Sequence, residues 1–277
     1  MMNAFKTSLC LASTALILVL AIPASAATGD WAEGQKTRIR LVASGAGADG
    51  MIDGAIEIAL PPGWKTYWRN PGTAGIAPEF DFSASRNLAA PAVSFPVPEV
   101  VDDGYSVTNV YVGGVVLPFR AAVTDAKMAV ELALTVRLGV CDEVCVPEEV
   151  TARLAVPPGE NDPATAAVLT TARARLPGPP EPGVFAVDSA AREGGSDLRP
   201  VFRIAATVPA DAEPKLLVEG PVDWAPYAPA FAGRDGDRVL FDAKFSRLGA
   251  KTPIAGAEIR VTMEAGGRAI EQRVPLD

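Results

Sequence analysis

Two cysteines, Cys141 and Cys145, are the residues of this chain with the clearest potential for chemistry. They lie four positions apart in the sequence CDEVCVP, and the third cysteine, Cys10, lies in an N-terminal segment that we expect to be removed. The chain has no histidine, which excludes Ser-His triads, Cys-His nucleophile pairs and histidine-based zinc or copper(II) sites. The dithiol is therefore where a function has to be sought.

The N-terminus has the pattern of a secretory signal peptide. Lys6 supplies the positive charge, an apolar run follows at residues 9–22, and the small residues ending at Ala26 fit a signal peptidase site. We expect cleavage after Ala26, so that residues 1–26 are removed and the mature protein is exported. In an oxidising compartment, two cysteines this close form a disulfide unless something reduces them.

Composition narrows the possible partners of the mature protein. No later segment approaches the roughly 20 apolar residues of a spanning helix, so no membrane insertion is expected. The formal net charge of the full chain, −8, argues against binding to nucleic acid or to an anionic membrane surface. No phosphate-binding loop or dinucleotide-binding glycine pattern lies between a strand and a helix, and we expect no cofactor.

Short alternating segments predict an antiparallel β-sandwich over residues 27–158. The strands are expected at residues 38–42, 55–60, 79–82, 92–95, 115–123, 130–140 and 150–156. Residues 64–75 are dense in aromatic residues, proline and glycine, and are expected to form a loop. In this loop Trp64, Tyr67, Trp68 and Arg69 could form a sugar or anion platform. We favour a scaffold role, with the tryptophans packed under the loop and Arg69 bonding its carbonyl groups.

Residues 159–183 are predicted to form a short helix and a proline-rich linker. Asp162 suits the N-cap and Pro163 the first helical position, while PGPPEPG at residues 177–183 cannot continue a helix. Residues 184–277 then predict a second β-sandwich, with strands at residues 185–188, 201–207, 215–219, 238–245, 258–263 and 268–274. In this region Trp224, Tyr227 and Phe231 favour core or corner packing over a binding groove.

The cysteine pair has two opposing interpretations. As a structural staple, a ring this small should contribute only about 2 kcal/mol, against about 4 to 5 for a bridge that closes a hundred residues. As an exchange pair, it needs a thiolate, a neighbouring thiol to resolve the mixed disulfide, and enough exposure for a partner to approach. Asp142 and Glu143 are expected to raise the thiol pKa values by their negative charge, which suits a reductant better than a strong oxidant.

A third interpretation is Cu(I) binding, because two thiolates are soft ligands of the kind that Cu(I) prefers. The methionines outside the leader, Met51, Met128 and Met263, are scattered along the chain and fit core positions better than a metal site. The sequence therefore predicts no metal site, although copper binding stays an alternative.

Three ordered motifs resemble a known family. They are GWKTYWRNPGTAG at residues 63–75, DDGYSVTNVYVGGVVLPF at residues 102–119 and CDEVCVPEEV at residues 141–150. Together they are similar to the periplasmic N-terminal domain of the DsbD thiol:disulfide interchange proteins, and more closely to the ScsB branch, the suppressors of copper sensitivity. The resemblance covers about residues 30–156, and the second β region is similar to an extra module of the ScsB branch.

The resemblance implies a fold and a place in an electron pathway. It implies an all-β protein of two immunoglobulin-like antiparallel sandwiches, located in the periplasm. The Cys141–Cys145 pair would receive electrons from a membrane-embedded DsbD/ScsB-type donor and pass them to periplasmic thioredoxin-fold proteins. The family connects such relays with cytochrome c biogenesis and copper tolerance.

The resemblance also implies site residues, with departures from the family pattern. Asp102, Asp103 and Tyr105 fall on the segment that caps and tunes the pair in the family. The family's capping phenylalanine aligns with Gly104, so Tyr105 is the expected shielding ring. Three residues separate the cysteines here, where the DsbD type has five. The chain ends at Asp277 without the family's transmembrane and thioredoxin domains, and a separate protein is expected to reduce it.

Overall fold

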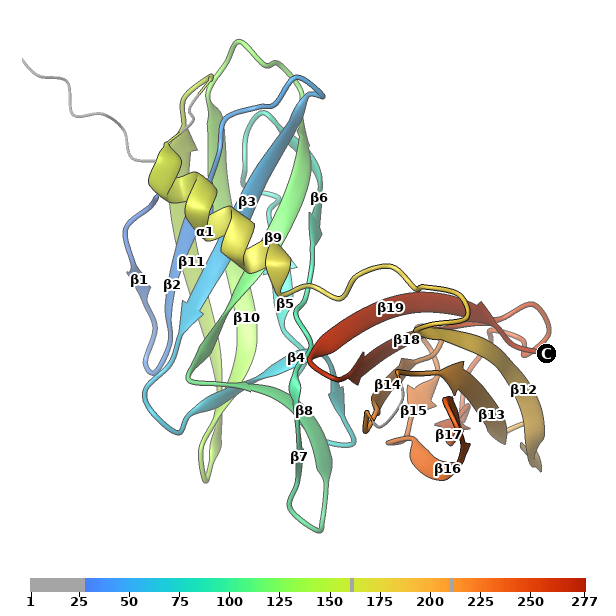
Figure 1. The fold of residues 1–277 in the computed structure, drawn as a ribbon. Coiled ribbons are helices and arrows are strands. Elements are labelled where there is room, and N and C mark those ends of the chain that lie inside the picture. The colour runs from blue at the N-terminus through green and yellow to red at the C-terminus, as the bar shows by residue number, and fades with distance from the viewer. Residues whose placement is uncertain (1–27, 160–161, 210–211) are drawn as a thin grey trace, which may run out of the picture.

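The computed structural model describes residues 28–159, 162–209 and 212–277 (Figure 1). Within these ranges the regular structure is two pairs of antiparallel sheets and a helix that lies between them in the chain. This confirms the predicted all-β class with two immunoglobulin-like sandwiches. The predicted leader at residues 1–26, including Cys10, lies outside the described residues. No helix of the described part combines the length and apolar character needed to cross a membrane.

The first module, residues 28–159, consists of two sheets packed face to face. One sheet contains, in spatial order, β1 (Ala32–Glu33), β2 (Arg38–Ala43), β3 (Met51–Ala59), β9 (Gly114–Val123) and β6 (Leu88–Val93). The other contains β11 (Cys145–Val156), β10 (Val130–Cys141), β4 (Lys65–Gly72), β8 (Val107–Val112) and β7 (Glu99–Asp102), with β5 (Glu79–Asp81) on β10. Alternate residues of both sheets face inward, and Trp68 and Leu134 lie fully buried between them.

Strand β4 stands where the sequence analysis expected a loop, and that prediction was wrong. Tyr67 and Trp68 are both buried, on opposite faces of the strand. The residues that suggested a loop, Pro71 and Gly72, come at the end of β4, where its register with β8 shifts after Tyr67. Proline and glycine are tolerated in a strand at such irregular positions, so their presence did not exclude a strand.

The predicted helix is confirmed as α1 (Pro163–Ala174), which lies across the first sheet (Figure 1). Asp162 is its N-cap, and its Oδ2 accepts a hydrogen bond of 2.8 Å from the Thr165 N–H. Leu169 and Ala172 face inward and pack toward β2, β3 and β9. The proline-rich linker that follows is attached to the second module, because Gly178 donates to the Ala269 carbonyl at 2.9 Å.

The second module, residues 184–277, is again a pair of sheets around its own core. One sheet contains β12 (Ala186–Ser196), β13 (Arg199–Thr207), β17 (Arg238–Ser246) and β15 (Ala225–Pro226), with β16 (Ala230–Asp235) on β17. The other contains β14 (Lys215–Glu219), β18 (Glu258–Ala265) and β19 (Arg268–Pro275). Each predicted strand of this region overlaps an observed one.

The two modules share buried surface. Leu217 belongs to β14 of the second module, yet its side chain is 6% exposed and lies in the buried cluster of the first module. Leu216 and Val218, its neighbours along β14, belong to the core of the second module. Because side chains alternate between the two faces of a strand, β14 contributes to both cores at once.

Candidate functional site

The two cysteines form a disulfide across the end of a hairpin. Cys141 is the last residue of β10 and Cys145 the first of β11, and they stand directly opposite each other in the register of the two strands. The turn between them is closed by a hydrogen bond from the Asp142 N–H to the Val144 carbonyl. The hairpin points toward the same end of the first module as the β7–β8 hairpin (Figure 1).

The two cysteines differ strongly in exposure. Cys141 is 1% exposed and packs with Tyr67 and Val110, whereas Cys145 is exposed. A protein partner can therefore approach Cys145 directly and cannot approach Cys141 without first opening the site. This asymmetry is what an exchange pair needs, since one cysteine meets the partner and the other resolves the mixed disulfide.

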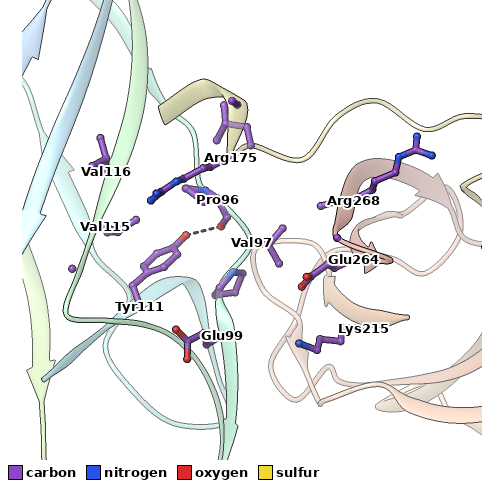
Figure 2. A pocket seen from close by; sticks show the side chains of 16 residues that line it. Pro96, Val97, Glu99, Tyr111, Val115, Val116, Arg175, Lys215, Glu264 and Arg268 are labelled. Carbon is purple, nitrogen blue, oxygen red and sulfur yellow. Dashed lines mark hydrogen bonds between the residues drawn. The ribbon is translucent and has the colours of Figure 1, made fainter. Parts of the chain in front are cut away.

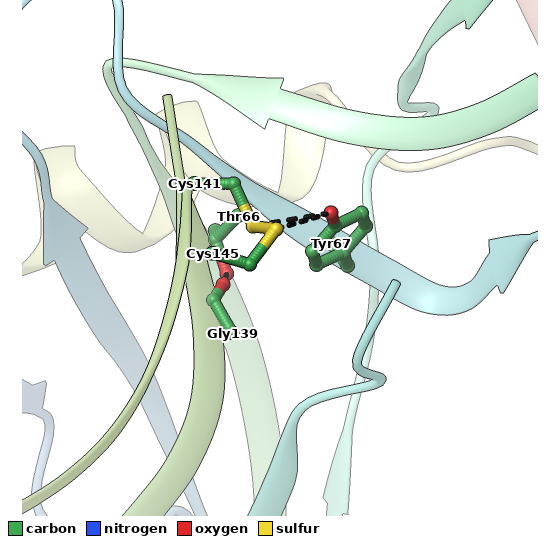
Figure 3. Close-up of a disulfide and its surroundings, with 5 residues drawn as sticks. All are labelled: Thr66, Tyr67, Gly139, Cys141 and Cys145. Atoms are coloured by element: carbon green, nitrogen blue, oxygen red, sulfur yellow. Dashed lines mark hydrogen bonds between the residues drawn. A yellow bond between two sulfur atoms is a disulfide. The ribbon is translucent and has the colours of Figure 1, made fainter. Parts of the chain in front are cut away.

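The side chain that lies against the disulfide is Tyr67 (Figure 3). Its hydroxyl oxygen is 3.1 Å from Cys141 Sγ and 3.4 Å from Cys145 Sγ. Neither sulfur of a disulfide carries a proton, so the hydroxyl group is the donor. Burial raises the pKa of Tyr67 above its usual value, which keeps the hydroxyl protonated and able to donate at neutral pH.

Strand pairing explains why Tyr67 reaches the sulfurs. In the register of β4 with β10, Lys65 stands opposite Cys141 and Thr66 opposite Val140. Tyr67 is two positions from Lys65 and so shares the face of the sheet on which Cys141 lies. The Thr66 hydroxyl donates to the Gly139 carbonyl at 2.9 Å, which fastens the two strands next to the disulfide (Figure 3).

Gly75 packs closely against the tyrosine ring. A Cβ atom at this position would collide with the Tyr67 ring, and the backbone has φ +111°, which side-chain-bearing residues rarely adopt. This requirement explains a glycine at the end of the motif at residues 63–75.

We predict that Gly75→Ala displaces the Tyr67 ring and lowers the rate of thiol–disulfide exchange several-fold. Gly63→Ala is the matched control, because Gly63 also has a positive φ, +82°, but a Cβ there would meet nothing within 4 Å. Both variants carry backbone strain, and only Gly75→Ala disturbs the ring. Exchange rates and urea unfolding of both proteins test this, and equal losses in exchange would contradict it.

The predicted cap residues lie on the β7–β8 hairpin. Asp103 Oδ1 accepts hydrogen bonds from the N–H groups of Tyr105 at 2.9 Å and Ser106 at 2.8 Å, and Asp102 Oδ1 accepts one from Gly104 at 2.9 Å. The backbone bonds from Ser106 and Tyr105 lower the pKa of Asp103. These two carboxylates therefore shape the turn, and Gly104 takes a positive φ of +82° within it.

Tyr105 does not shield the disulfide in this structure. Its side chain is fully exposed, so the ring covers neither sulfur atom, and Tyr67 lies there instead. The β7–β8 hairpin approaches the pair through Val101, which packs against Tyr67, Val110 and Cys141. The expected capping role of Tyr105 therefore stays a prediction that this arrangement does not support.

Some of the other aromatic and basic residues singled out in the sequence have structural positions. Trp68 is buried in the first core and Trp224 in the second. The prediction that Arg69 bonds loop carbonyl groups was wrong, because Arg69 pairs with the carboxylates of Glu219 and Glu271 in the second module. Tyr227 and Phe231 belong to the same segment as Trp224, but they are exposed, at 46% and 60%, and both line a pocket, so the predicted core packing is confirmed for Trp224 and not for these two.

A cavity of about 580 Å³ lies apart from the cysteines, between the two modules and the end of α1 (Figure 2). Its charged lining residues are Glu99, Arg175, Lys215, Glu264 and Arg268. Both signs are present, so the charges favour no single class of ligand. Tyr111 lines it too, and its hydroxyl donates to the Pro96 carbonyl at 2.7 Å. Among the described residues, no cluster of three or more His, Cys, Asp or Glu side chains could hold a metal ion.

Comparison with known proteins relates the residues of this site to a protein family. Residues 38–157 match the model of the family described as Thiol:disulfide interchange protein DsbD, N-terminal. This part of the chain is a DsbD N-terminal domain. The matched range contains both cysteines and Tyr67, and it ends one residue after β11.

One solved structure resembles the chain as a whole. The crystal structure of the N-terminal periplasmic domain of ScsB from Proteus mirabilis is similar with a TM-score of 0.70 and 22% sequence identity. The similarity covers 90% of this chain and 99% of that one, so the two-module fold is shared. A search of curated proteins found no match. In the DsbD N-terminal domain of this chain, the disulfide-bonded pair is the feature that fits thiol–disulfide interchange.

The sequence did not predict that Tyr67 belongs to the site around the disulfide. The hydroxyl and the first cysteine are 74 positions apart, and only the pairing of β4 with β10 brings them together. A local signal was present, because Thr66, Tyr67 and Trp68 are all residue types that are enriched in strands. The dense prolines and glycines nearby concealed that signal.

Proposed function

We propose that this protein is a periplasmic thiol–disulfide relay that passes reducing equivalents through the Cys141–Cys145 pair. The electrons would come from a membrane-embedded DsbD/ScsB-type donor and go to thioredoxin-fold proteins of the periplasm. The observation that carries the proposal is the pairing of an exposed Cys145 with a buried Cys141 under the Tyr67 hydroxyl. The leader at residues 1–26 supplies the route of export.

The chemistry proceeds in two displacements, starting from the reduced pair. The Cys145 thiolate attacks a sulfur of the client disulfide, forming a mixed disulfide and releasing one client thiolate. The Cys141 thiolate then attacks Cys145 Sγ, which forms the Cys141–Cys145 disulfide and releases the second client thiolate. Two electrons pass to the client, and the donor's dithiol restores the reduced pair by the reverse sequence.

Tyr67 suits both displacements. Its hydroxyl lies within hydrogen-bonding distance of both sulfurs and can donate to whichever one carries negative charge. A hydrogen bond to a charged sulfur lowers the thiol pKa and increases the thiolate fraction available for attack. The buried position of Cys141 protects that thiol from outside reagents while it waits to resolve the mixed disulfide.

A direct exchange experiment tests the proposal. The reduced protein is mixed with an oxidised thioredoxin-fold protein, and both redox states are followed by thiol alkylation and mass spectrometry. We expect transfer within minutes, and none from a Cys141→Ala, Cys145→Ala double variant. Absence of transfer, with a pair potential below about −300 mV, would mean a structural disulfide. A large shift of that potential on adding Cu(I) would point to copper binding.

The structural alternative also predicts a stability effect of known size. Removing a disulfide that closes so small a ring should lower the free energy of unfolding by about 2 kcal/mol. Urea unfolding of the double cysteine variant measures this loss. If the variant loses this stability but keeps full biological activity, the pair is a staple. If activity is abolished in a folded variant, the pair has a chemical role.

A further inference from the structure

Arg69 joins the two modules at the strand that carries Tyr67. Its Nε lies 3.0 Å from both carboxylate oxygens of Glu219 on β14, and its terminal Nη2 lies 2.6 Å from Glu219 Oε2. The same Nη2 also bonds Glu271 on β19. Arg69 and Glu219 are only 16% and 18% exposed, so these ion pairs are largely shielded from water. A fork-shaped contact of this kind fixes orientation as well as distance.

The surroundings of Arg69 leave it little freedom. The guanidinium carbon stacks 4.3 Å from the centre of the Trp68 ring and 5.7 Å from that of Phe95. Burial lowers the pKa of Arg69, but the hydrogen bonds and charges of Glu219 and Glu271 outweigh this and raise it, so the group stays charged. Arg260 lies 3.9 Å from Glu271 and supplies a second positive charge for the two carboxylates.

Consecutive residues of β4 connect the disulfide to the second module. Lys65 and Thr66 pair with the end of β10, and Tyr67 lies on the sulfurs. Trp68 fills the first core, and Arg69 holds the second module. Asn70 continues this contact, because its Nδ2 donates to the Val218 carbonyl at 3.4 Å.

We infer that Arg69 is a positioning residue, whose ion pairs with Glu219 and Glu271 fix β4 so that the Tyr67 hydroxyl stays against the two sulfurs. The second module thereby becomes part of the apparatus that sets the reactivity of the cysteine pair. Arg69 touches neither sulfur and acts through Tyr67. The inference gives the relay proposed above a role for its second module, yet its readouts do not require any client protein.

The main measurement is the pH dependence of alkylation of the reduced pair, together with its reduction potential against glutathione. Arg69→Met should raise the thiol pKa and slow alkylation at neutral pH, with an effect no larger than that of Tyr67→Phe. Arg69→Lys keeps the positive charge but loses the fork-shaped contact with Glu219, so it should raise the thiol pKa by less than Arg69→Met does, but still measurably. Arg137→Met is the matched control, because Arg137 lies on β10 and pairs with Glu149 at 2.6 Å within the first module. It should leave the thiol pKa unchanged.

Two further variants separate positioning from a simple charge effect. Glu219→Ala removes a negative charge, which by itself would lower the thiol pKa; loosening of β4 would raise it. In the second comparison, Arg69→Met is combined with Tyr67→Phe. Non-additive effects, with the double variant equal to Tyr67→Phe alone, would support action through Tyr67.

Any one of three results would overturn the inference. They are a lowered thiol pKa in Glu219→Ala, additive effects in the double variant, and a folded Arg69→Met protein whose cysteine pair keeps its thiol pKa and reduction potential. If Arg69→Met does not fold, the sign of the shift in Glu219→Ala decides, since that variant keeps the bond between Arg69 and Glu271. Failure of the proposed relay would appear separately: the thiol pKa values would shift in the variants as expected here, but the reduced protein would transfer no electrons to a thioredoxin-fold protein.

Discussion

Cys141→Ala is expected to trap a client as a stable mixed disulfide, whereas Cys145→Ala is expected to trap little or none. In the first variant the remaining thiol, Cys145, is exposed and has no neighbour to resolve the adduct. In the second the remaining thiol, Cys141, is 1% exposed and lies under Tyr67. Because attack requires contact between the sulfurs, we expect a difference on the order of tenfold or more in adduct.

The trapping experiment uses an oxidised thioredoxin-fold protein at fixed concentration and non-reducing gels. The double cysteine variant is the blank, and alkylation of each single variant in native buffer reports how accessible its thiol is. In denaturant both single variants should react equally fast, which shows that burial causes the difference. Equal trapping by the two variants in native buffer would contradict the assigned order of attack.

Tyr67→Phe is expected to raise the thiol pKa of the reduced pair by about one to two units. A hydrogen bond to a charged group is worth about 1.5–3 kcal/mol, and one pKa unit corresponds to about 1.4 kcal/mol. The lost thiolate fraction outweighs the gain in nucleophilicity, because nucleophilicity rises with pKa by only about half as much. Exchange at neutral pH should therefore slow by about three- to tenfold.

The control for this variant is Tyr111→Phe. Tyr111 is also buried and also donates a hydrogen bond, but to the Pro96 carbonyl, so its loss should affect stability without changing the cysteine pair. The pH dependence of iodoacetamide alkylation measures the shift in both variants. An unchanged thiol pKa in Tyr67→Phe, or an equal change in both, would mean that the hydroxyl does not tune the sulfurs.

The fold was predictable from the sequence where each strand carries its own signal. Residues 215–219 form a short apolar run between Pro214 and Gly220, residues 238–245 alternate after the turn at Gly236, and the structure has β14 and β17 there. The helix was predictable because Asp162 and Pro163 mark its start locally. β4 was not predictable in the same way, since Pro71 and Gly72 obscured a strand that is defined mainly by its neighbours.

The site was predictable only in part, for a physical reason. The cysteines can be recognised in the sequence because they are only four positions apart. The residues that tune them come close to them only through tertiary strand pairing. Tyr67 is 74 positions from Cys141, and Arg69 is 150 positions from Glu219. Nothing in a single sequence fixes such pairings, and the exposure of Tyr105 depends equally on how its hairpin packs.

Leu217 has a consequence for how the chain can be divided. A protein cut at the proline-rich linker would leave a hole in the first module where this side chain fits, and would expose the leucine to water on the second. Loss of a buried leucine costs about 2–5 kcal/mol, a large share of the stability of a module of this size. We expect the whole protein to melt in a single calorimetric transition, and the isolated first module to melt at a lower temperature. The chain is built from two sandwiches, but it should unfold as one cooperative unit.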